Sequence, residues 1–249
     1  QGLKQNYTQA AKLYELAANA GNADAQYNLG SLYNHGNGVL QNFYEAAKWY
    51  ELAATQHNTS AQNNLGFLYH NGTGVTQSFT KAKELFHAAA EAGDPSAQYN
   101  LGYLYSKGRG VEQNMEEAVN WFLKAALQGH TNAQFQLALC YKSGSGIAPN
   151  EEEAIKWLTV AANEGHTNAQ YSLGLLYKQQ SSKKSIDYAM KWLSRAASNE
   201  HVSACFDLGL LYKSLQQFEN AFKWLKRAAV KGHKDAQYEL GYFYLNGLF

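Results

Sequence analysis

The stretch AQYNLGSLY, residues 25–33, decides the fold because close copies of it return along the whole chain. The copies begin at Ala25, Ala61, Ala97, Ala133, Ala169, Ala204 and Ala236. The first four intervals are 36 residues each, and the next two are 35 and 32. A period of this length indicates an array of stacked repeats, each of which buries its apolar face against its neighbours.

A second segment alternates with the first, for example AAKLYELAA from Ala10 and AMKWLSRAA from Ala189. The five tryptophans fall at one position of it: Trp49, Trp121, Trp157, Trp192 and Trp224, with Leu13 and Leu85 in the other two copies. Both segments carry apolar residues at i, i+4, i+7 and i+8, which is the pattern of an amphipathic helix. Each repeat is therefore predicted to hold a first helix that ends at the closing Tyr and a second helix that ends at Ala-Ala.

Glycines recur at two kinds of position. One lies inside the first helix: Gly30, Gly66, Gly102, Gly174, Gly209 and Gly241. Because a glycine there costs about 1 kcal/mol relative to alanine, we predict that two helices approach closely at these points. The other kind is a pair, GNGV at 36–39, which returns as GTGV, GRGV and GSGI in the next three repeats.

The glycine pair follows a helix and precedes another helix, so it is not a nucleotide-binding loop. A dinucleotide fingerprint needs a preceding strand and a third glycine, and a phosphate-binding P-loop needs Gly-Lys-Ser/Thr. We predict instead that the first glycine is a left-handed helix cap. The Val or Ile that follows the second glycine is expected to pack into the core.

Composition and charge exclude several functions. The 249 residues carry 21 basic and 20 acidic side chains, a net charge of +1, which argues against nucleic-acid or membrane-surface binding by bulk charge. No apolar run approaches the roughly 20 residues of a membrane-spanning helix. With only two cysteines a disulfide scaffold is not expected, and Cys140 is predicted to be a buried apolar residue.

Residues that could support metal binding or catalysis do not form a recognisable site. Four histidines stand three residues before a leading alanine: His130, His166, His201 and His233. Repeats stack about 10 Å apart, whereas zinc lies about 2 Å from its ligands, so one ion cannot join this row. Asn22, Asn58 and Asp94 hold the same place in other repeats, which predicts helix N-caps. No HExxH, CxxC or Ser/His/Asp arrangement occurs, so we predict no enzyme, catalytic residue, cofactor or metal.

The combined pattern A-x-x-x-L-G-x-L-Y-x-x-G-x-G-V, followed by A-x-x-W-x-x-x-A-A, resembles the Sel1-like repeat family, a relative of the tetratricopeptide repeat. The resemblance covers essentially the whole chain. It implies an all-α, right-handed superhelical solenoid of antiparallel helix pairs with a concave inner face. We expect one repeat domain, 1–249, with first helices starting near residues 23, 59, 95, 131, 167, 202 and 234. Both ends resemble partial repeats, so we expect a piece of a longer array.

The resemblance also implies a function. Proteins of this family act as adaptors that hold other proteins, many of them bacterial and periplasmic or exported toward a host as virulence factors, others in the endoplasmic reticulum lumen. We therefore expect a monomeric scaffold that binds a protein or peptide, does not bind nucleic acid and does not insert into a membrane. The alternatives are an accessory region of a larger enzyme, a glycan or cell-wall binding module whose aromatic rows stack on sugars, and a nucleic-acid reader built on helical repeats.

The partner-binding residues are expected on the first helices, at the second, third, sixth and ninth positions after the leading alanine. The candidates are Tyr27, Asn28, Asn64, Phe67, Asn100, Tyr103, Gln136, Lys142, Lys178 and Lys213. The asparagines could form an amide ladder that pairs with an extended peptide, or could bond only to neighbouring helices and water. The lysines could form a basic stripe for an acidic partner, or could be solvated helix ends. The aromatic side chains could contact a partner or belong to the core.

Overall fold

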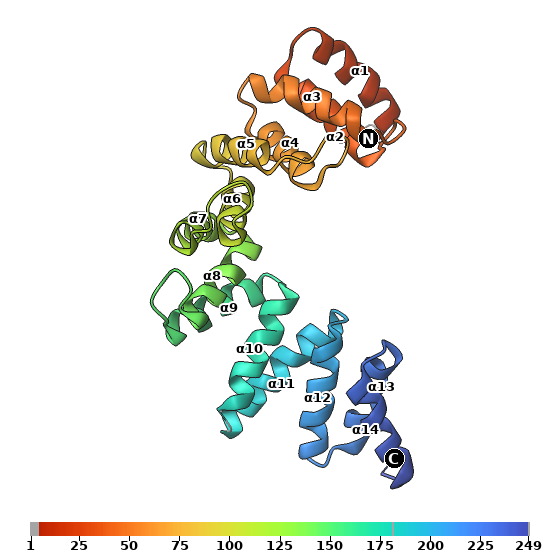
Figure 1. Ribbon diagram of the computed structural model, residues 1–249. Helices are drawn as coiled ribbons and strands as arrows, with labels where there is room; N and C mark the ends of the chain where they lie inside the picture. Colours follow the sequence, from red (N-terminus) through yellow and green to blue (C-terminus); the bar gives the residue numbers. More distant parts are fainter. Residues whose placement is uncertain (1–4, 181, 249) are drawn as a thin grey trace. The chain divides into compact units, whose positions relative to one another are not determined.

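The computed structural model describes residues 5–180 and 182–248, and within these ranges all regular secondary structure is helical (Figure 1). The helices are α1 (Tyr7–Asn19), α2 (Ala23–His35), α3 (Phe43–Thr55), α4 (Thr59–Asn71), α5 (Phe79–Glu91), α6 (Pro95–Lys107), α7 (Met115–Leu127), α8 (Thr131–Ser143), α9 (Glu151–Asn163), α10 (Thr167–Gln179), α11 (Lys183–Ser198), α12 (Val202–Ser214), α13 (Phe218–Val230) and α14 (Lys234–Leu245). Even-numbered helices are the first helices of the repeats. The all-α, tetratricopeptide-like solenoid class expected from the sequence is confirmed.

The chain divides into two compact units. The N-terminal unit comprises Gln1–Ala133 with Gly144–Ala148, and the C-terminal unit comprises Gln134–Ser143 with Pro149–Phe249. Within each unit, helices that follow one another in the sequence pack side by side, as α4 packs on α5 and α12 on α13. The core of each unit consists of alanines and leucines with a few large rings, such as Phe86 in the N-terminal unit and Phe243 in the C-terminal unit.

The helix ends lie slightly beyond the predicted ones. The first helix continues one or two residues past its tyrosine: α2 ends at His35, where Gly36 adopts a left-handed φ of 70°. The second helix continues one residue past Ala-Ala, as α3 does to Thr55. The prediction that the tyrosine ends the helix was wrong because the glycine, rather than the tyrosine, supplies the conformation that stops it.

Each first helix begins with a side-chain cap. Oδ1 of Asn22 accepts a hydrogen bond from the Ala25 N–H at 2.8 Å, and Nδ1 of His130 accepts one from the Ala133 N–H at 3.2 Å. The other capping residues are Asn58, Asp94, His166, His201 and His233. The predicted N-cap role of the four histidines is therefore confirmed.

The glycines inside the first helices allow the predicted close contact at five of six positions. A Cβ added to Gly66 would lie 2.8 Å from the ring of Phe86, and one added to Gly102 would lie 2.9 Å from the ring of Phe122. Comparable contacts surround Gly30, Gly174 and Gly209. The prediction was wrong for Gly241, which has nothing within 4 Å, because no helix follows α14 among the described residues.

The glycine pairs of the loops connect successive repeats. The first glycine caps the helix, and the second also has positive φ, 71° at Gly74. A Cβ on Gly74 would collide with the backbone of Phe43, the first residue of α3. Val75, half-buried, packs against the core cluster of α3 and α4 as predicted. The pair is therefore a packing device, and its second glycine lets each loop lie on the start of the preceding second helix.

A row of buried glutamines, which the sequence reasoning missed, joins each helix pair to the next. The Gln98 side chain donates to the Ala90 carbonyl at 3.2 Å and accepts from Nε2 of Gln128 at 2.8 Å. Equivalent bonds to the end of the preceding second helix are made by the buried Gln26, Gln62 and Gln170 and by the exposed Gln237. Cys205 holds the same place in its repeat and is buried like Cys140, whose predicted burial is confirmed. The signal was the recurrent Ala-Gln that opens six of the seven first segments.

Candidate functional site

A pocket of about 220 Å³ opens between α4 and α6 in the N-terminal unit. It is lined by Phe67, His70, Asn71, Phe86, Tyr99, Asn100 and Tyr103. Three of these, Phe67, Asn100 and Tyr103, are candidate residues from the sequence, and the structure brings them together. We call this site the α4–α6 pocket.

The repeat geometry builds the pocket. Phe67 and Tyr103 occupy the sixth position of neighbouring first helices, one repeat apart. Phe67 is 54% exposed, whereas Phe86 of α5 is only 2% exposed and supplies the base of the pocket. Phe86 reaches this place because Gly66 presents no side chain toward its ring. The glycine inside α4 therefore determines both the packing of the repeat and the depth of the pocket.

The predicted asparagine ladder makes bonds between helices. Asn100 Nδ2 donates to Oδ1 of Asn63 on α4 at 2.9 Å, and Asn64 Nδ2 donates to the buried Tyr50 hydroxyl at 3.3 Å. Each bond uses one of the two N–H groups of its amide. Asn28 lies half-buried on α2. Of the three asparagines, only Asn100 lines the pocket.

Two exposed cations flank the pocket beside Tyr103. The guanidinium of Arg109 lies 3.4 Å from Nε2 of His70 and 5.8 Å from the centre of the Tyr103 ring. The ammonium of Lys107 lies 5.9 Å from the same ring. In the part of the chain that the structure describes, neither cation forms an ion pair with a carboxylate. The sequence analysis did not single out either residue, because Arg109 stands between the glycines of a loop that was interpreted as purely structural.

The three predicted lysines lie in the C-terminal unit, and two of them are already paired. Lys178 Nζ lies 2.9 Å from Asp207, and Lys213 Nζ lies 2.5 Å from Glu239. In both pairs a ninth-position lysine meets the third-position carboxylate of the next repeat. Lys142 is exposed. The stripe therefore offers less free positive charge than the lysines alone suggest.

The hydroxyl of Tyr171 adds to one of these pairs by donating to Oδ2 of Asp207 at 2.9 Å. Burial, reinforced by the Asp207 carboxylate, raises the pKa of Tyr171 to about 12. The remaining candidates, Tyr27 on α2 and Gln136 on α8, are half-buried, and the Tyr27 ring lies 5.9 Å from that of Tyr50. Neither Tyr27 nor Gln136 lines the α4–α6 pocket.

The capping histidines also stack on aromatic residues of the preceding repeat, which the sequence analysis missed. Ring centres lie 4.8 Å apart for Tyr99 and His130, and 4.4 Å apart for Tyr171 and His201. The same contact joins Phe135 to His166 and Phe206 to His233. Second-position rings thus support the array, which weakens the alternative that they form a platform for sugars. The available signal was that each of these aromatics precedes a repeat whose cap is histidine.

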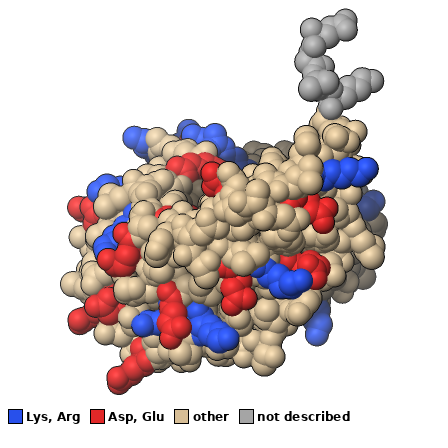
Figure 2. All heavy atoms as spheres, turned by 90° about the horizontal axis from the view of Figure 1, so that it is seen from above, with Lys and Arg blue, Asp and Glu red and all other residues tan. Residues whose placement is uncertain are grey.

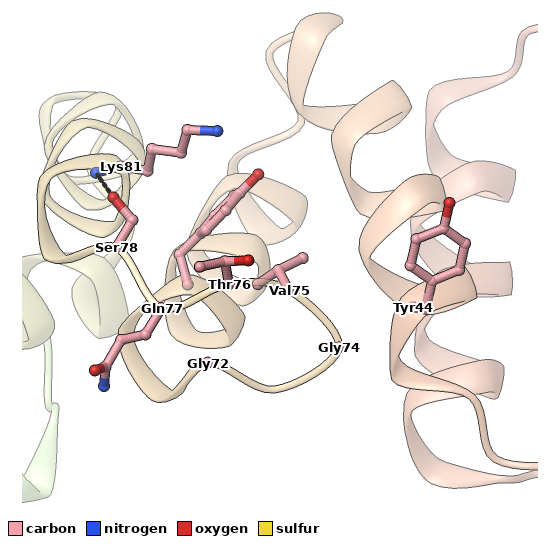
Figure 3. Close-up of a pocket in the computed structure, with 9 residues that line it drawn as sticks. Tyr44, Gly72, Gly74, Val75, Thr76, Gln77, Ser78 and Lys81 are labelled. Atoms are coloured by element: carbon pink, nitrogen blue, oxygen red, sulfur yellow. Dashed lines mark hydrogen bonds between the residues drawn. The ribbon is translucent and has the colours of Figure 1, made fainter.

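A second and more open hollow, of about 780 Å³, lies beside the glycine loop between α4 and α5 (Figure 3). Tyr44 of α3 stands across it from Lys81 of α5, and the loop runs between them (Figure 3). Ser78 caps α5 by accepting from the Lys81 N–H at 3.3 Å, and the Lys81 ammonium lies 4.9 Å from the Tyr69 ring. Much of its wall is loop backbone, and no candidate residue from the sequence lines it.

Further hollows of about 330, 340 and 630 Å³ lie elsewhere on the described residues, and no candidate residue from the sequence lines them. Basic and acidic side chains are interspersed on the face seen in Figure 2. Among the described residues, no group of three or more His, Cys, Asp or Glu side chains is placed to hold a metal ion. Nor is any described helix long and apolar enough to cross a membrane.

Antiparallel helix pairs, repeated in register and joined by glycine-capped loops, define an α-helical repeat protein of the tetratricopeptide-like class. The family model of the Sel1 repeat matches residues 1–22, 23–58, 59–94, 95–130, 131–166, 167–201, 202–233 and 234–249. The chain belongs to the Sel1 repeat family, as the sequence pattern suggested.

Solved structures agree with this assignment. A protective antigen present in uropathogenic Escherichia coli strains, displaying an SLR fold, is 31% identical over 99% of this chain, with a TM-score of 0.63. This chain spans 62% of the length of that protein. A Sel1 repeat protein from Oxalobacter formigenes is 29% identical over 90% of this chain and 99% of its own, with a TM-score of 0.77. No curated protein sequence matched the chain.

Proposed function

We propose that this chain is a non-enzymatic scaffold that binds a peptide segment of a partner protein on the first helices of its N-terminal unit. The α4–α6 pocket is the observation that carries the proposal. It is a concave site, it gathers three of the candidate residues, and an exposed large apolar side chain, Phe67, stands at its opening. The Sel1 repeat is a general protein-interaction fold, so the proposal adds the place and the kind of ligand.

The size of the pocket favours a side chain over a small molecule. Its volume of about 220 Å³ is smaller than the roughly 300–1,000 Å³ of typical small-molecule sites. Aromatic residues and arginine are enriched in protein interfaces, and here three exposed or half-exposed rings line the pocket, one of which, Tyr103, lies 5.8 Å from Arg109. The pocket therefore resembles a place where one anchoring side chain of a partner is buried.

Selection from a random heptapeptide display library tests the proposal. The full chain should enrich peptides that Phe67→Ala binds at least tenfold more weakly, since truncating a buried anchor contact costs about 1.4 kcal/mol or more. Leu127→Ala is the matched control, because Leu127 is also an exposed apolar residue, at the end of α7. If no peptide is enriched over an unrelated protein, or both variants lose binding equally, the proposal is wrong.

We extend the proposal to an exported bacterial protein that acts toward a host. The similar protein from uropathogenic Escherichia coli, described as a protective antigen, supports this extension. Fractionation of the source cells with an antibody against the chain tests it. Recovery outside the cytoplasm is expected, and recovery only in the cytoplasm would contradict it.

A further inference from the structure

We infer that the α4–α6 pocket selects peptides in which an aromatic or large aliphatic side chain lies close to an acidic residue. This inference rests on the proposed function and specifies the chemistry of its ligand. The apolar side chain would enter the pocket, and the ligand carboxylate would bind Arg109 and Lys107 at its edge.

The lining of the pocket specifies the apolar part of the ligand. Phe86, Phe67, Tyr99 and Tyr103 contribute four rings, and the polar groups of His70, Asn71 and Asn100 complete the wall. A volume of about 220 Å³ equals that of roughly seven liquid waters at about 30 Å³ each, which one large side chain can replace. Aromatic rings favour offset or edge-on contact with another ring, so an aromatic anchor suits this wall best.

The local charge specifies the acidic part. Neither α4 nor α6 contains Asp or Glu, and the pocket lining contains none. The nearest acidic residues in the sequence are Asp94, whose Oδ1 caps α6 at 2.7 Å from the Ala97 nitrogen, and Glu112, which is exposed and is not among the ion pairs of the described residues. A carboxylate brought by a ligand would therefore meet two cations that no carboxylate of the described chain neutralises.

Arg109 is particular to this repeat and is held in place. The equivalent loop residues between the two glycines are Asn37, Thr73 and Ser145, which are all neutral. The Arg109 guanidinium lies 5.6 Å from the Phe79 ring centre and 5.8 Å from that of Tyr103, both cation–π distances. A guanidinium so positioned can bind a carboxylate through two parallel N–H···O bonds.

The C-terminal unit contains a carboxylate at a position where the pocket has none. There the ninth-position Lys178 meets the third-position Asp207 of the next repeat. At the corresponding places beside the pocket stand His70 and Asn100. The carboxylate that the chain itself supplies in the C-terminal unit is thus replaced by an amide, and the cations of α6 and its loop are left for a carboxylate of the ligand.

Sequencing the heptapeptide selections on charge variants tests the inference. Peptides selected by the wild-type chain should be enriched at least fivefold for an aromatic, Leu or Met residue within three positions of Asp or Glu. Arg109→Glu combined with Lys107→Glu should lose this acidic preference and gain a preference for Lys and Arg. Lys12→Glu, at an exposed position on α1, is the charge control and should leave the preference unchanged.

The outcomes separate the two levels of the argument. If the selected peptides depend on Phe67 but show no preference for Asp or Glu, this inference is overturned and the proposed function stands. The same conclusion follows if the double charge variant still selects acidic peptides. A failure to enrich any peptide overturns the proposed function itself. Circular dichroism of each variant should match the wild type, because Lys107, Arg109 and Lys12 are all exposed.

Discussion

In the N-terminal unit, the third positions of α4 and α6 carry Asn64 and Asn100, whereas α12 and α14 of the C-terminal unit carry Asp207 and Glu239 at the same places. The carboxylates close the face of the C-terminal unit by pairing with lysines of the preceding repeat. The amides leave a pocket and unpaired cations on the N-terminal unit. One repeat geometry therefore builds two different faces, and under the proposed function the difference between support and recognition lies in a few side chains.

The residues that cap the first helices also differ along the chain. The first helices of the first two repeats are capped by Asn22 and Asn58, whose amides do not titrate. In the C-terminal unit α10 and α12 are capped by His166 and His201, whose rings also pack on aromatic rings of the preceding repeat. The N-terminal unit also has two ionisable caps, Asp94 and His130, so the two units differ in how many caps are histidine and not in kind.

The largest effect is expected where the shared geometry itself is broken. In Gly102→Val the new Cβ would lie 2.9 Å from the Phe122 ring and 3.1 Å from the Ala118 carbonyl oxygen, inside the N-terminal unit. Overpacking of this kind costs about 3 kcal/mol or more when backbone must move. Urea denaturation should show that loss.

The matched control is Gly241, which has nothing within 4 Å. Gly241→Ala should stabilise α14 by up to about 1 kcal/mol, the difference in helix propensity. A Gly102→Val chain with the wild-type denaturation midpoint would contradict the account of the glycines inside the first helices.

Acid should weaken both units, and the C-terminal unit more, because burial lowers the pKa of two histidine caps there and of one, His130, in the N-terminal unit. Burial lowers the pKa of His166 and His201, although a backbone hydrogen bond at each ring, and then the Asp207 carboxylate at His201, partly offset the effect. The unfolded chain, with histidine pKa values of about 6.5, then binds more protons than the folded chain. This stability is therefore fully present above about pH 7.5 and is lost as the pH falls through 6.5 toward the lower folded-state values.

Replacing both histidines tests that difference between the units. Asparagine is an equally good N-cap and carries no titratable proton. The double variant His166→Asn and His201→Asn should therefore lose a large part of the change in unfolding free energy between pH 8 and pH 5.5, while His130 keeps its share in both proteins. If the variant and the wild type show the same pH dependence in urea titrations, the histidine caps do not account for it.

Asp207→Asn removes the carboxylate that pairs with Lys178 and places an amide at the third position, as Asn100 does in the N-terminal unit. Because the pair is partly exposed, the stability loss should be modest, about 1 kcal/mol or less. The pKa of Tyr171, about 12 in the wild type, should fall but stay above its usual value, since burial is the larger cause. Ultraviolet titration of the tyrosines measures this, and an unchanged profile would show that Asp207 does not act on Tyr171.

The smallest effects are expected at Asn100, which lines the pocket, and at Asn64, which does not. Asn100→Ala should weaken peptide binding several-fold, because Asn100 lines the pocket, and should also lower stability through the loss of its hydrogen bond to Asn63. Asn64→Ala should lower stability by about 1 kcal/mol, the typical net value of one hydrogen bond, here the one to Tyr50, and should leave peptide binding unchanged. Fluorescence anisotropy of a selected peptide and urea denaturation on both variants check this, and equal effects in both assays would contradict the division of roles.

The features that the sequence predicts well are the local ones. Helix pairs follow from the apolar spacing, and the caps at Gly36 and His166 follow from residues within one turn of a helix end. The glutamine at position 98 and the stacking of Tyr171 on His201 were missed, because they depend on which residues of adjacent repeats face each other. Their only signal was recurrence at a fixed offset, about 30 residues away.

The candidate site was predicted in part. Positional reasoning placed Phe67, Asn100 and Tyr103 on one face, but the pocket also needs Phe86 from a second helix. Arg109 was missed because its loop varies in sequence between repeats while its backbone does not. The pairing of Lys178 with Asp207 needed the three-dimensional register of two repeats before it could be seen.

We propose that the N-terminal unit recognises the partner peptide and that the C-terminal unit stabilises the array. Nuclear magnetic resonance of the isotope-labelled chain, titrated with a peptide selected from the library, tests it most directly. The account predicts that amide shift changes concentrate on α4, α6 and the loop that carries Arg109. Changes confined to residues 149–249, with none around Phe67 and Tyr103, would contradict it.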